Sequence, residues 1–267
     1  MSAQAAVAVA PGVSARRGLS GSLLLLEMKR LRRNRRTLIF AVIMPALFFF
    51  LFTTGSRHAK FDQYGIVPYY MVGMATYATF NSLLFGGGAI AAERAVGWPR
   101  QLRIGGLSGL QYVATKVLVA YMSAVPGVIL VLLVGNTLRH VEFSAGRWLA
   151  IAVSALLAAL PVAALGVALG YLIRPQALQT VLGLGSTILA MIGTVFIPVS
   201  AFSTPILDVD KVLPPYWIAQ APRAAATGSW LGWEGLLILL AWAVAFSALA
   251  AWAYRRDSLR PGVVGAT

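Results

Sequence analysis

The sequence predicts an all-α integral membrane protein that crosses the bilayer six times, with both ends in the cytoplasm. Of its 267 residues, 59% are hydrophobic and only 11% are charged, whereas soluble domains carry about 25% charged residues. Long uncharged stretches recur along the chain, and about 20 apolar residues suffice for a helix to cross the hydrocarbon core. The basic residues collect on one side of these stretches. Together, these features exclude a water-soluble globular protein.

The net charge of +14 would by itself also suit a nucleic-acid partner. In a membrane protein the more common cause is orientation, because Lys and Arg collect in cytoplasmic loops beside anionic lipid. We therefore predict a lipid bilayer, and no nucleic acid, as the partner of the basic residues. The sequence has no Cys, which excludes disulfides and thiolate metal sites.

Two segments precede the first predicted span. Residues 1–17 are predicted to form a disordered cytoplasmic tail, since no basic region precedes their apolar part, as it would in a secretory signal. Residues 18–36 predict an amphipathic helix at the membrane surface. Its apolar face carries Leu24, Met28 and Leu31, and its basic face carries Lys29, Arg33 and Arg36. A positively charged anchor without any other role is the alternative interpretation.

The uncharged stretches define the predicted six-span transmembrane domain, residues 37–256. The predicted spans cover about residues 37–56, 66–91, 110–136, 148–173, 177–200 and 233–254. Spans four and five are separated only by Arg174-Pro175-Gln176, where the charge and the helix-breaking proline predict a tight turn. Residues 257–267 follow as a cytoplasmic tail.

The basic residues orient the predicted spans. One side of the bilayer receives sixteen of them: Arg16, Arg17, Lys29, Arg30, Arg32, Arg33, Arg35, Arg36, Arg94, Arg100, Arg103, Lys116, Arg174, Arg255, Arg256 and Arg260. The other side receives Arg57, Lys60, Arg139, Arg147, Lys211 and Arg223. The positive-inside rule makes the first side cytoplasmic. We therefore expect a multi-pass protein of the plasma (inner) membrane.

The segment between spans two and three, residues 91–110, is too long for a tight turn and is amphipathic. Leu102, Ile104 and Leu107 can dock on the membrane or on a partner. The order of residue types here resembles a cytoplasmic stretch of the permease subunits of type-2 ATP-binding cassette (ABC) exporters. That stretch is similar to E-R-x-x-G-x-x-x-x-L, followed by small residues, Ser, Tyr and Lys. The corresponding residues of this chain are Glu93, Arg94, Gly97, Leu102, Leu107, Ser108, Tyr112 and Lys116.

The resemblance extends over nearly the whole chain, since its length, six spans and N-terminal surface helix are also similar to that family. Two positions depart from the pattern, because Trp98 stands where Thr is frequent and Gly105-Gly106 where Pro is frequent. In the family, this stretch forms a coupling helix that fits a cleft of the ATPase subunit. The resemblance implies that the coupling residues are Glu93, Arg94, Gly97, Arg100, Leu102 and Arg103. The alternative is an ordinary solvated loop in which Arg94 neutralises Glu93.

The segment before span six contains several prolines and few charges around residues 198–202 and 213–217. Irregular backbone at membrane depth is tolerated only where protein covers it or where it lines a wet cavity. The segment resembles the pair of short re-entrant helices that closes the outer end of the pathway in the same family. The resemblance implies an outer gate formed by Pro214, Pro215, Tyr216 and Trp217. An interfacial aromatic belt containing Trp217, Trp230 and Trp233 is the alternative.

No stretch of the sequence reads G-x-x-x-x-G-K-[ST], the loop that binds ATP phosphates in many ATPases. Gly86-Gly87-Gly88 has no following Lys and predicts close packing between helices instead. We therefore expect no cofactor on this chain, and the resemblance implies that ATP and Mg are bound by a separate ATPase subunit. The spans also carry no acid deep inside them, which disfavours coupling to an ion gradient.

The residues fit two other classes of function less well. An intramembrane serine enzyme would need a base beside Ser186, but the histidines, His58 and His140, fall in predicted outer loops. A passive channel or scaffold would need a polar lining to conduct ions, whereas the spans are mostly apolar. An apolar pathway suits a hydrophobic or amphipathic substrate. Its expected lining residues are Phe40, Phe49, Phe52, Tyr70, Asn81 and Phe85.

The sequence thus predicts the permease subunit of an ATP-driven exporter. The expected cargo is a drug, an antibiotic or a lipid-linked molecule. The resemblance implies that the partners are two copies of an ABC ATPase subunit and a second permease subunit, identical or related.

Overall fold

The computed structural model of the chain describes residues 21–33, 35–55, 60–61 and 64–258. The predicted tail 1–17, His58 and the C-terminal tail beyond residue 258 lie outside the described residues. The described part is built from helices, apart from one short antiparallel pair of two-residue strands, β1 (Lys60–Phe61) and β2 (Tyr64–Gly65). The prediction of an all-α fold is confirmed.

The first half of the chain forms a short helix, three long helices and a connecting helix. These are α1 (Gly21–Arg33), α2 (Arg35–Phe52), α3 (Ile66–Ala95), α4 (Trp98–Ile104) and α5 (Gly109–Arg139). The second half contains α6 (Ala145–Ala158), α7 (Leu160–Leu172), α8 (Pro175–Ile192), the short 3₁₀ helix η1 (Val199–Ala201), α9 (Thr204–Asp210), α10 (Pro214–Thr227) and α11 (Gly232–Ser258). Pro161 lies at the start of α7, where its missing N–H is tolerated, and the fourth predicted span breaks there into two helices.

The six predicted spans correspond to α2, α3, α5, α6 with α7, α8, and α11. Among the described residues, four segments are long and apolar enough to cross a membrane: Gly109–Arg139, Ala145–Leu172, Pro175–Ile192 and Gly232–Ser258. The apolar part of α2 is shorter, Ala41–Phe52. The 30-residue helix α3 is not among the four, because Tyr, Thr, Asn and Gly residues interrupt its apolar sequence. The exact count of six spans therefore stays a prediction.

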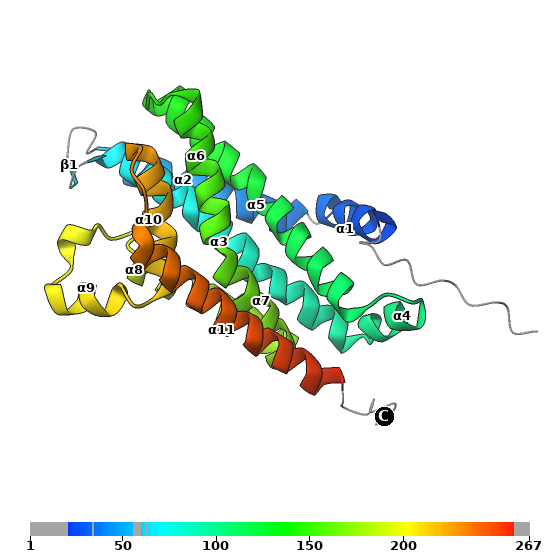
Figure 1. Cartoon of the computed structure of the whole chain (residues 1–267). Helices are drawn as coiled ribbons and strands as arrows, with labels where there is room; N and C mark the ends of the chain where they lie inside the picture. The colour runs from blue at the N-terminus through cyan, green and yellow to red at the C-terminus, as the bar shows by residue number, and fades with distance from the viewer. Residues whose placement is uncertain (1–20, 34, 56–59, 62–63, 259–267) are drawn as a thin grey trace, which may run out of the picture.

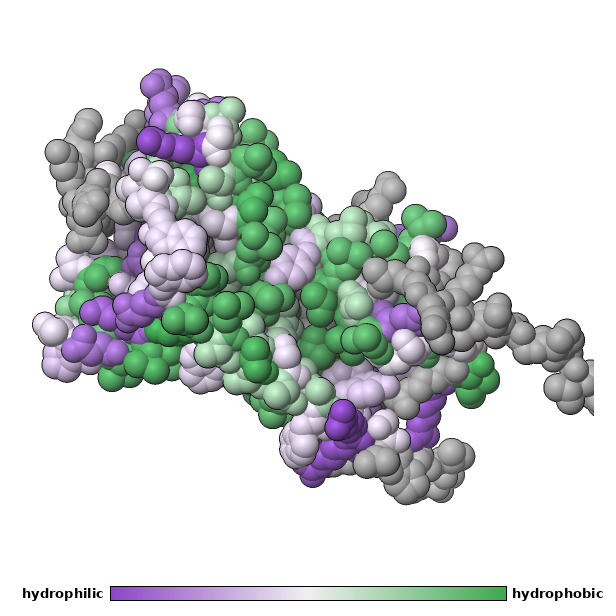
Figure 2. Space-filling view, in the orientation of Figure 1, coloured by the Kyte–Doolittle hydropathy of each residue, from purple (hydrophilic) through white to green (hydrophobic). Residues whose placement is uncertain are grey.

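The long helices pack side by side, and the connecting elements separate toward two ends of the bundle (Figure 1). The helix α4 and the C-terminal end of α11 lie at one end, with α1 on the same side of the bundle. The elements β1, α9 and α10 lie toward the other end. Figure 2 shows apolar residues across the middle of the visible face and hydrophilic residues gathered toward its margins. This distribution is typical of a protein whose middle contacts lipid rather than water.

The helix α3 forms the centre of the fold, and nearly every residue between Tyr69 and Leu84 is buried. Each glycine of its triplet approaches a different helix. A methyl group on Gly86 would lie 2.8 Å from the Ala120 Cβ of α5, and one on Gly88 would lie 3.3 Å from the Gln179 side chain of α8. A methyl group on Gly87 would overlap the carbonyl of Gly166 on α7. A methyl group on Gly170, one turn further along α7, would lie 2.5 Å from the carbonyl oxygen of Gly87. The predicted role of the triplet in close helix packing is confirmed.

Two turns follow directly from their residues. The helix α8 begins at Pro175, immediately after Arg174, as the predicted turn between spans four and five requires. At its other end, α8 stops at Ile192, before the predicted span limit of residue 200, because Thr194 adopts a left-handed conformation with φ of 57°. The chain then leaves the bundle through η1 and α9 before α10 returns to it.

The predicted surface helix at residues 18–36 corresponds to α1 and the start of α2. Lys29 and Arg33 are exposed on α1, as the amphipathic pattern predicts. The buried residues of α1 are Leu23 and Glu27, however, while Leu24, Met28 and Leu31 are only half-buried. The inward face is therefore rotated toward an acidic residue that the pattern did not single out.

Candidate coupling site and substrate cavity

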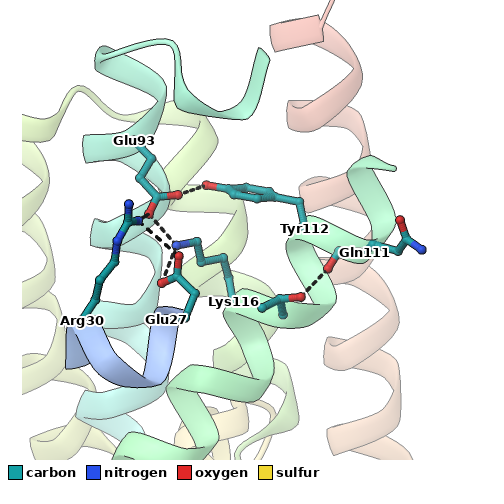
Figure 3. A network of polar contacts seen from close by, with 7 residues as sticks. Glu27, Arg30, Glu93, Gln111, Tyr112 and Lys116 are labelled. Atoms are coloured by element: carbon teal, nitrogen blue, oxygen red, sulfur yellow. Dashed lines mark hydrogen bonds and ion pairs between the residues drawn. The ribbon is translucent and has the colours of Figure 1, made fainter. Parts of the chain in front are cut away.

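Four charged side chains from three helices meet at the end of the bundle that carries α4 (Figure 3). Glu27 and Arg30 come from α1, Glu93 from the end of α3, and Lys116 from α5. The Lys116 Nζ lies 2.6 Å from Glu93 Oε1 and 2.9 Å from Glu27 Oε2. The Arg30 Nη1 lies 3.3 Å from both Glu27 Oε1 and Glu93 Oε1. Acids and bases therefore alternate in a closed set of four, which we name the charge ring.

Burial makes the charge ring energetically important. Only 4% of the Lys116 side chain and 7% of the Glu27 side chain are exposed, compared with 15% for Glu93 and 47% for Arg30. Removing one partner of a buried ion pair leaves an uncompensated charge away from water, which is strongly destabilising. The phenol of Tyr112 also donates a 2.7 Å hydrogen bond to Glu93 Oε2. The ring therefore fixes the relative positions of α1, α3 and α5 at this end.

Helical periodicity explains why these residues can meet. Glu27 and Arg30 are three residues apart, and Tyr112 and Lys116 are four apart, so each pair lies on one face of its helix. The start of α5 is held by a capping box, in which Ser108 accepts a hydrogen bond from the Gln111 N–H and Gln111 Oε1 accepts one from the Ser108 N–H. The register of Tyr112 and Lys116 is set by this cap.

The helix α4 is joined to the charge ring through Trp98. The guanidinium of Arg30 lies over the Trp98 ring, 5.1 Å from its centroid. The connection before α4 turns at Gly97, whose φ of 72° is a left-handed conformation that glycine adopts without strain. The short helix α4 thus follows α3 through a fixed turn and contacts α1 as well.

The solvated-loop alternative requires Arg94 to neutralise Glu93. In the structure, Arg94 binds other partners. Its Nη1 donates a 2.8 Å hydrogen bond to the carbonyl of Gly170 on α7, and its Nη2 pairs with Asp257 on α11. Its guanidinium also lies 5.3 Å from the centre of the Tyr171 ring. Adjacent residues of α3 therefore hold opposite sides of the bundle, with Glu93 binding α1 and α5 and Arg94 binding α7 and α11.

The other predicted coupling residues lie on or beside α4. Leu102 faces inward and packs against the apolar cluster that contains Ile90 and Tyr112. Arg100 is exposed, and Ile104 is 89% exposed. Arg103 also belongs to α4, but its side chain lies outside what the structure describes. The coupling role of all these residues stays a prediction, although the short amphipathic helix that it requires is present.

A cavity of about 730 Å³ extends from the charge ring into the bundle. It is bounded by α1, α2, α3, α5 and α8. The aromatic side chains of Phe48, Tyr77 and Phe85 line it. Uncharged polar groups also line it: Asn81, Ser82, Ser123, Gln179 and Ser186. All four residues of the charge ring border it as well. The cavity therefore combines a mostly apolar wall with a few polar groups, as small-molecule sites commonly do.

The predicted pathway residues divide between this cavity and other surroundings. Asn81 and Phe85 line the cavity. Phe49 is fully buried in the core, and Tyr70 is buried and stacks on Phe52 with 5.2 Å between ring centroids. Phe40 lies on α2, but its side chain is outside what the structure describes. Phe48 and Tyr77 were missed, because uniformly apolar helices give no signal for which side faces a cavity.

The predicted outer gate lies at the start of α10. Pro214 and Pro215 occupy the first helical positions and are buried. The indole N–H of Trp217 donates a 2.6 Å hydrogen bond to the carbonyl of Lys211, and Tyr216 packs edge-on against the Trp217 ring. Trp230 and Trp233 are instead exposed and pack against each other, as residues of an aromatic belt would be. The gating role of residues 214–217 stays a prediction.

Ser186 does not form part of a serine-enzyme site among the described residues. Its hydroxyl donates a 3.0 Å hydrogen bond to the Gly183 carbonyl on its own helix. His140 ends α5 in a left-handed conformation at the opposite end of the bundle from the charge ring.

Comparison with known proteins places the chain in a family. The sequence profile described as "ABC-2 family transporter protein" matches residues 56–252, which contain α3, the connection through α4, and nearly all of α11. The chain is also similar to the protein named "Putative transport permease YvfS" in Bacillus subtilis (strain 168), with 23% identity over 232 residues. That alignment covers 86% of this chain and 95% of the Bacillus protein. Membership of the family implies a multi-pass membrane protein with an ABC ATPase partner. The chain belongs to the ABC-2 family of transporters, as the permease type of subunit rather than as an enzyme.

Proposed function

We propose that the chain is the permease subunit of an ATP-driven exporter that moves a hydrophobic or amphipathic molecule out of the cell. Its expected cargo is a drug, an antibiotic or a lipid-linked compound. ATP and Mg would be bound by a separate ATPase subunit in two copies, and a second permease, identical or related, would complete the pathway. The chain would lie in the plasma membrane with both termini in the cytoplasm. The observation that carries this proposal is the continuity of the cavity with the charge ring beside α4.

Coupling would begin at α4. This helix exposes Arg100 and Ile104, which present a charge and an apolar side chain to a docked ATPase. Movement of α4 would be transmitted to the charge ring through Trp98 and Arg30, which lie in contact. Glu93 and Lys116 stand on α3 and α5, and both helices line the cavity. A tilt of these helices would therefore change the shape of the cavity directly.

The chemistry of the cavity supports the class of cargo. Aromatic side chains can bury an apolar part of the substrate, and each such contact contributes through removal of apolar area from water. The amide of Asn81 and the hydroxyl of Ser123 can hydrogen-bond a polar part. The acids and bases of the charge ring neutralise each other, so the ring offers no excess charge to a strongly ionic solute. A hydrophobic or amphipathic molecule from the inner leaflet fits this lining best.

The decisive experiment isolates the tagged chain from its native membrane in mild detergent and measures the ATPase subunit and the ATP hydrolysis that co-purify with it. Arg100→Ala removes an exposed charge of α4 and should weaken capture. Glu93→Gln alters the charge ring and should reduce substrate-stimulated hydrolysis more than capture. Arg147→Ala is the matched control, because Arg147 is exposed at the predicted outer side. It should change neither quantity.

Two results would contradict the proposal. One is the absence of any co-purifying ATPase from gently solubilised membranes, together with no effect of the α4 and ring variants. The other is transport of only strongly hydrophilic cargo by reconstituted vesicles that contain the complex. Passage of cargo without ATP would instead favour the passive channel.

A further inference from the structure

A buried arginine binds a residue just beyond the end of α8, on the side of the bundle remote from the charge ring. Arg223 of α10 is 3% exposed. Its Nη1 donates a 2.7 Å hydrogen bond to Thr194 Oγ1, and its Nη2 donates one of 2.6 Å to the Thr194 carbonyl. One planar guanidinium therefore binds both the side chain and the backbone of a single residue.

The helix α3 holds the same residue from the other side. The Tyr69 hydroxyl donates a 2.6 Å hydrogen bond to the Thr194 carbonyl, and the Arg223 guanidinium lies 4.1 Å from the centre of the Tyr69 ring. Tyr70 donates a further 3.3 Å bond to the Phe196 carbonyl. We name Tyr69, Thr194 and Arg223 the outer clamp. It joins α3, the end of α8 and α10 at one point.

The residue held by the outer clamp is in an unusual conformation. Thr194 is fully buried with a φ of 57°, and a β-branched residue at positive φ is a genuine outlier. Such conformations persist only where surrounding structure enforces them, and they are frequent in segments that switch. The positive charge of Arg223 also faces the C-terminus of α8, which carries a partial negative charge. The clamp therefore supplies both the hydrogen bonds and the charge that hold this turn.

The predicted outer gate is seated against the same turn. A methyl group on Gly193 would lie 2.7 Å from the Pro215 Cβ and carbonyl oxygen. The first turn of α10 thus rests on the backbone that the outer clamp fixes. Releasing the clamp would free the end of α8 and the start of α10 to separate.

One continuous helix connects the outer clamp to the charge ring. Tyr69 and Glu93 both belong to α3. At a rise of 1.5 Å per residue, they stand about 36 Å apart along its axis. A displacement of α3 at the charge ring therefore acts on Tyr69 at the other end of the same helix.

We propose that Arg223 is a positioning residue that keeps the outer end closed, and that opening requires the release of Thr194 from the outer clamp. That this opening is a step of transport rests on the proposed function. The clamp itself, however, can be tested without any ATPase, nucleotide or cargo.

The test uses the natural absence of cysteine. Ser186→Cys places a single thiol on α8, in the cavity wall and inward of Thr194. The labelling rate of this thiol by a membrane-impermeant maleimide, added outside intact cells, reports how open the outer end is. Arg223→Gln should raise the rate about tenfold or more, because hydrogen bonds to a charged donor typically change an equilibrium by that factor. Arg223→Lys should also raise it, since an ammonium cannot reproduce the planar fork.

Arg147→Gln is the matched control and should leave the rate unchanged, because Arg147 is exposed on the same predicted side. Thr194→Val tests the hydrogen bond between Arg223 and Thr194 from the threonine side. It removes the hydroxyl acceptor while keeping the shape, so it should raise the rate by a smaller factor. If Arg223→Gln fails to fold, Thr194→Val and Arg223→Lys decide the question. Unchanged labelling in the folded variants would overturn the proposal, whether or not an ATPase is captured by the chain.

Discussion

Lys116 stands between two carboxylates at the centre of the charge ring. Because only 4% of its side chain is exposed, we expect Lys116→Met to leave Glu27 and Glu93 close together with no buried cation between them. Removal of one member of a buried ion pair typically costs about 3–5 kcal/mol. Thermal unfolding of the purified protein in detergent should therefore show a marked loss of stability.

Arg30→Ala is the comparison for this prediction. Its side chain is 47% exposed, and exposed ion pairs contribute about 0–1 kcal/mol, so the loss of stability should be much smaller. Adding Glu27→Gln to Lys116→Met should restore part of the lost stability by removing one uncompensated charge. Equal losses for Lys116→Met and Arg30→Ala would show that the ring does not behave as a buried network.

The buried carboxyl of Asp210 makes the stability of the folded protein depend on pH. It ends α9 outside the long helices, is 2% exposed, and both carboxyl oxygens lack a hydrogen-bond partner among the described residues. Burial raises the pKa of its carboxyl to about 6, from 3.8. A raised pKa means that the folded state prefers the protonated acid. The contribution of this group to stability is therefore fully present below pH 3.8 and is lost as the pH rises through 6.

Asp210→Asn should remove this dependence. We expect the variant to unfold at a slightly higher temperature than the parent at pH 7 and at a similar temperature at pH 4. The measurement is thermal unfolding across this pH range, with Asp208→Asn as the control, because Asp208 is exposed on the same helix. A parent protein that is more stable at pH 7 than Asp210→Asn would contradict the assignment.

At the scale of elements, the close packing of α3 on α7 depends on Gly87, which lies against Gly166 and Gly170. A methyl group at Gly87 would overlap the Gly166 carbonyl, so Gly87→Ala forces the helices apart. Overpacking of this kind typically costs about 1–3 kcal/mol. The effect is measured by heating the purified protein and determining, by size-exclusion chromatography, how much of it remains monodisperse.

Gly183→Ala is the matched control, since nothing lies within 4 Å of a methyl group added there. Alanine also favours a helix over glycine by about 0.5–1 kcal/mol, so this variant should be neutral or more stable. If both substitutions gave the same result, the contact between α3 and α7 would not limit stability.

At the scale of the whole molecule, α3 is the common member of both polar centres. One end of α3 carries Glu93 of the charge ring and Arg94, which binds α7 and α11, while the other end carries Tyr69 of the outer clamp. The helices that share these contacts also enclose the cavity between them. This arrangement gives a mechanical connection between the end that would meet an ATPase and the end that would release cargo.

Much of the candidate site could be predicted because its residues lie in one local stretch. Glu93, Tyr112 and Lys116 belong to the resemblance around α4, and the structure brings them together within hydrogen-bonding distance. Glu27 was missed, although it is the only acid among the many bases that precede the first span. A single acid among so many bases was a signal in the sequence that Glu27 has a specific partner. Asp257, the partner of Arg94, is more than 160 residues away from it and gave no local sign.

The sequence by itself determined the membrane class, the helical fold and the family, because hydropathy, charge and a short motif are properties of neighbouring residues. Only the tertiary structure decided which side of each apolar helix faces the cavity, which acid pairs with which base, and how Arg223 reaches Thr194. These outcomes depend on the rotation and spacing of helices that are far apart in the chain. When a helix is apolar all round, no periodicity specifies that rotation. Close packing at residues such as Gly87 and Gly166 fixes it instead.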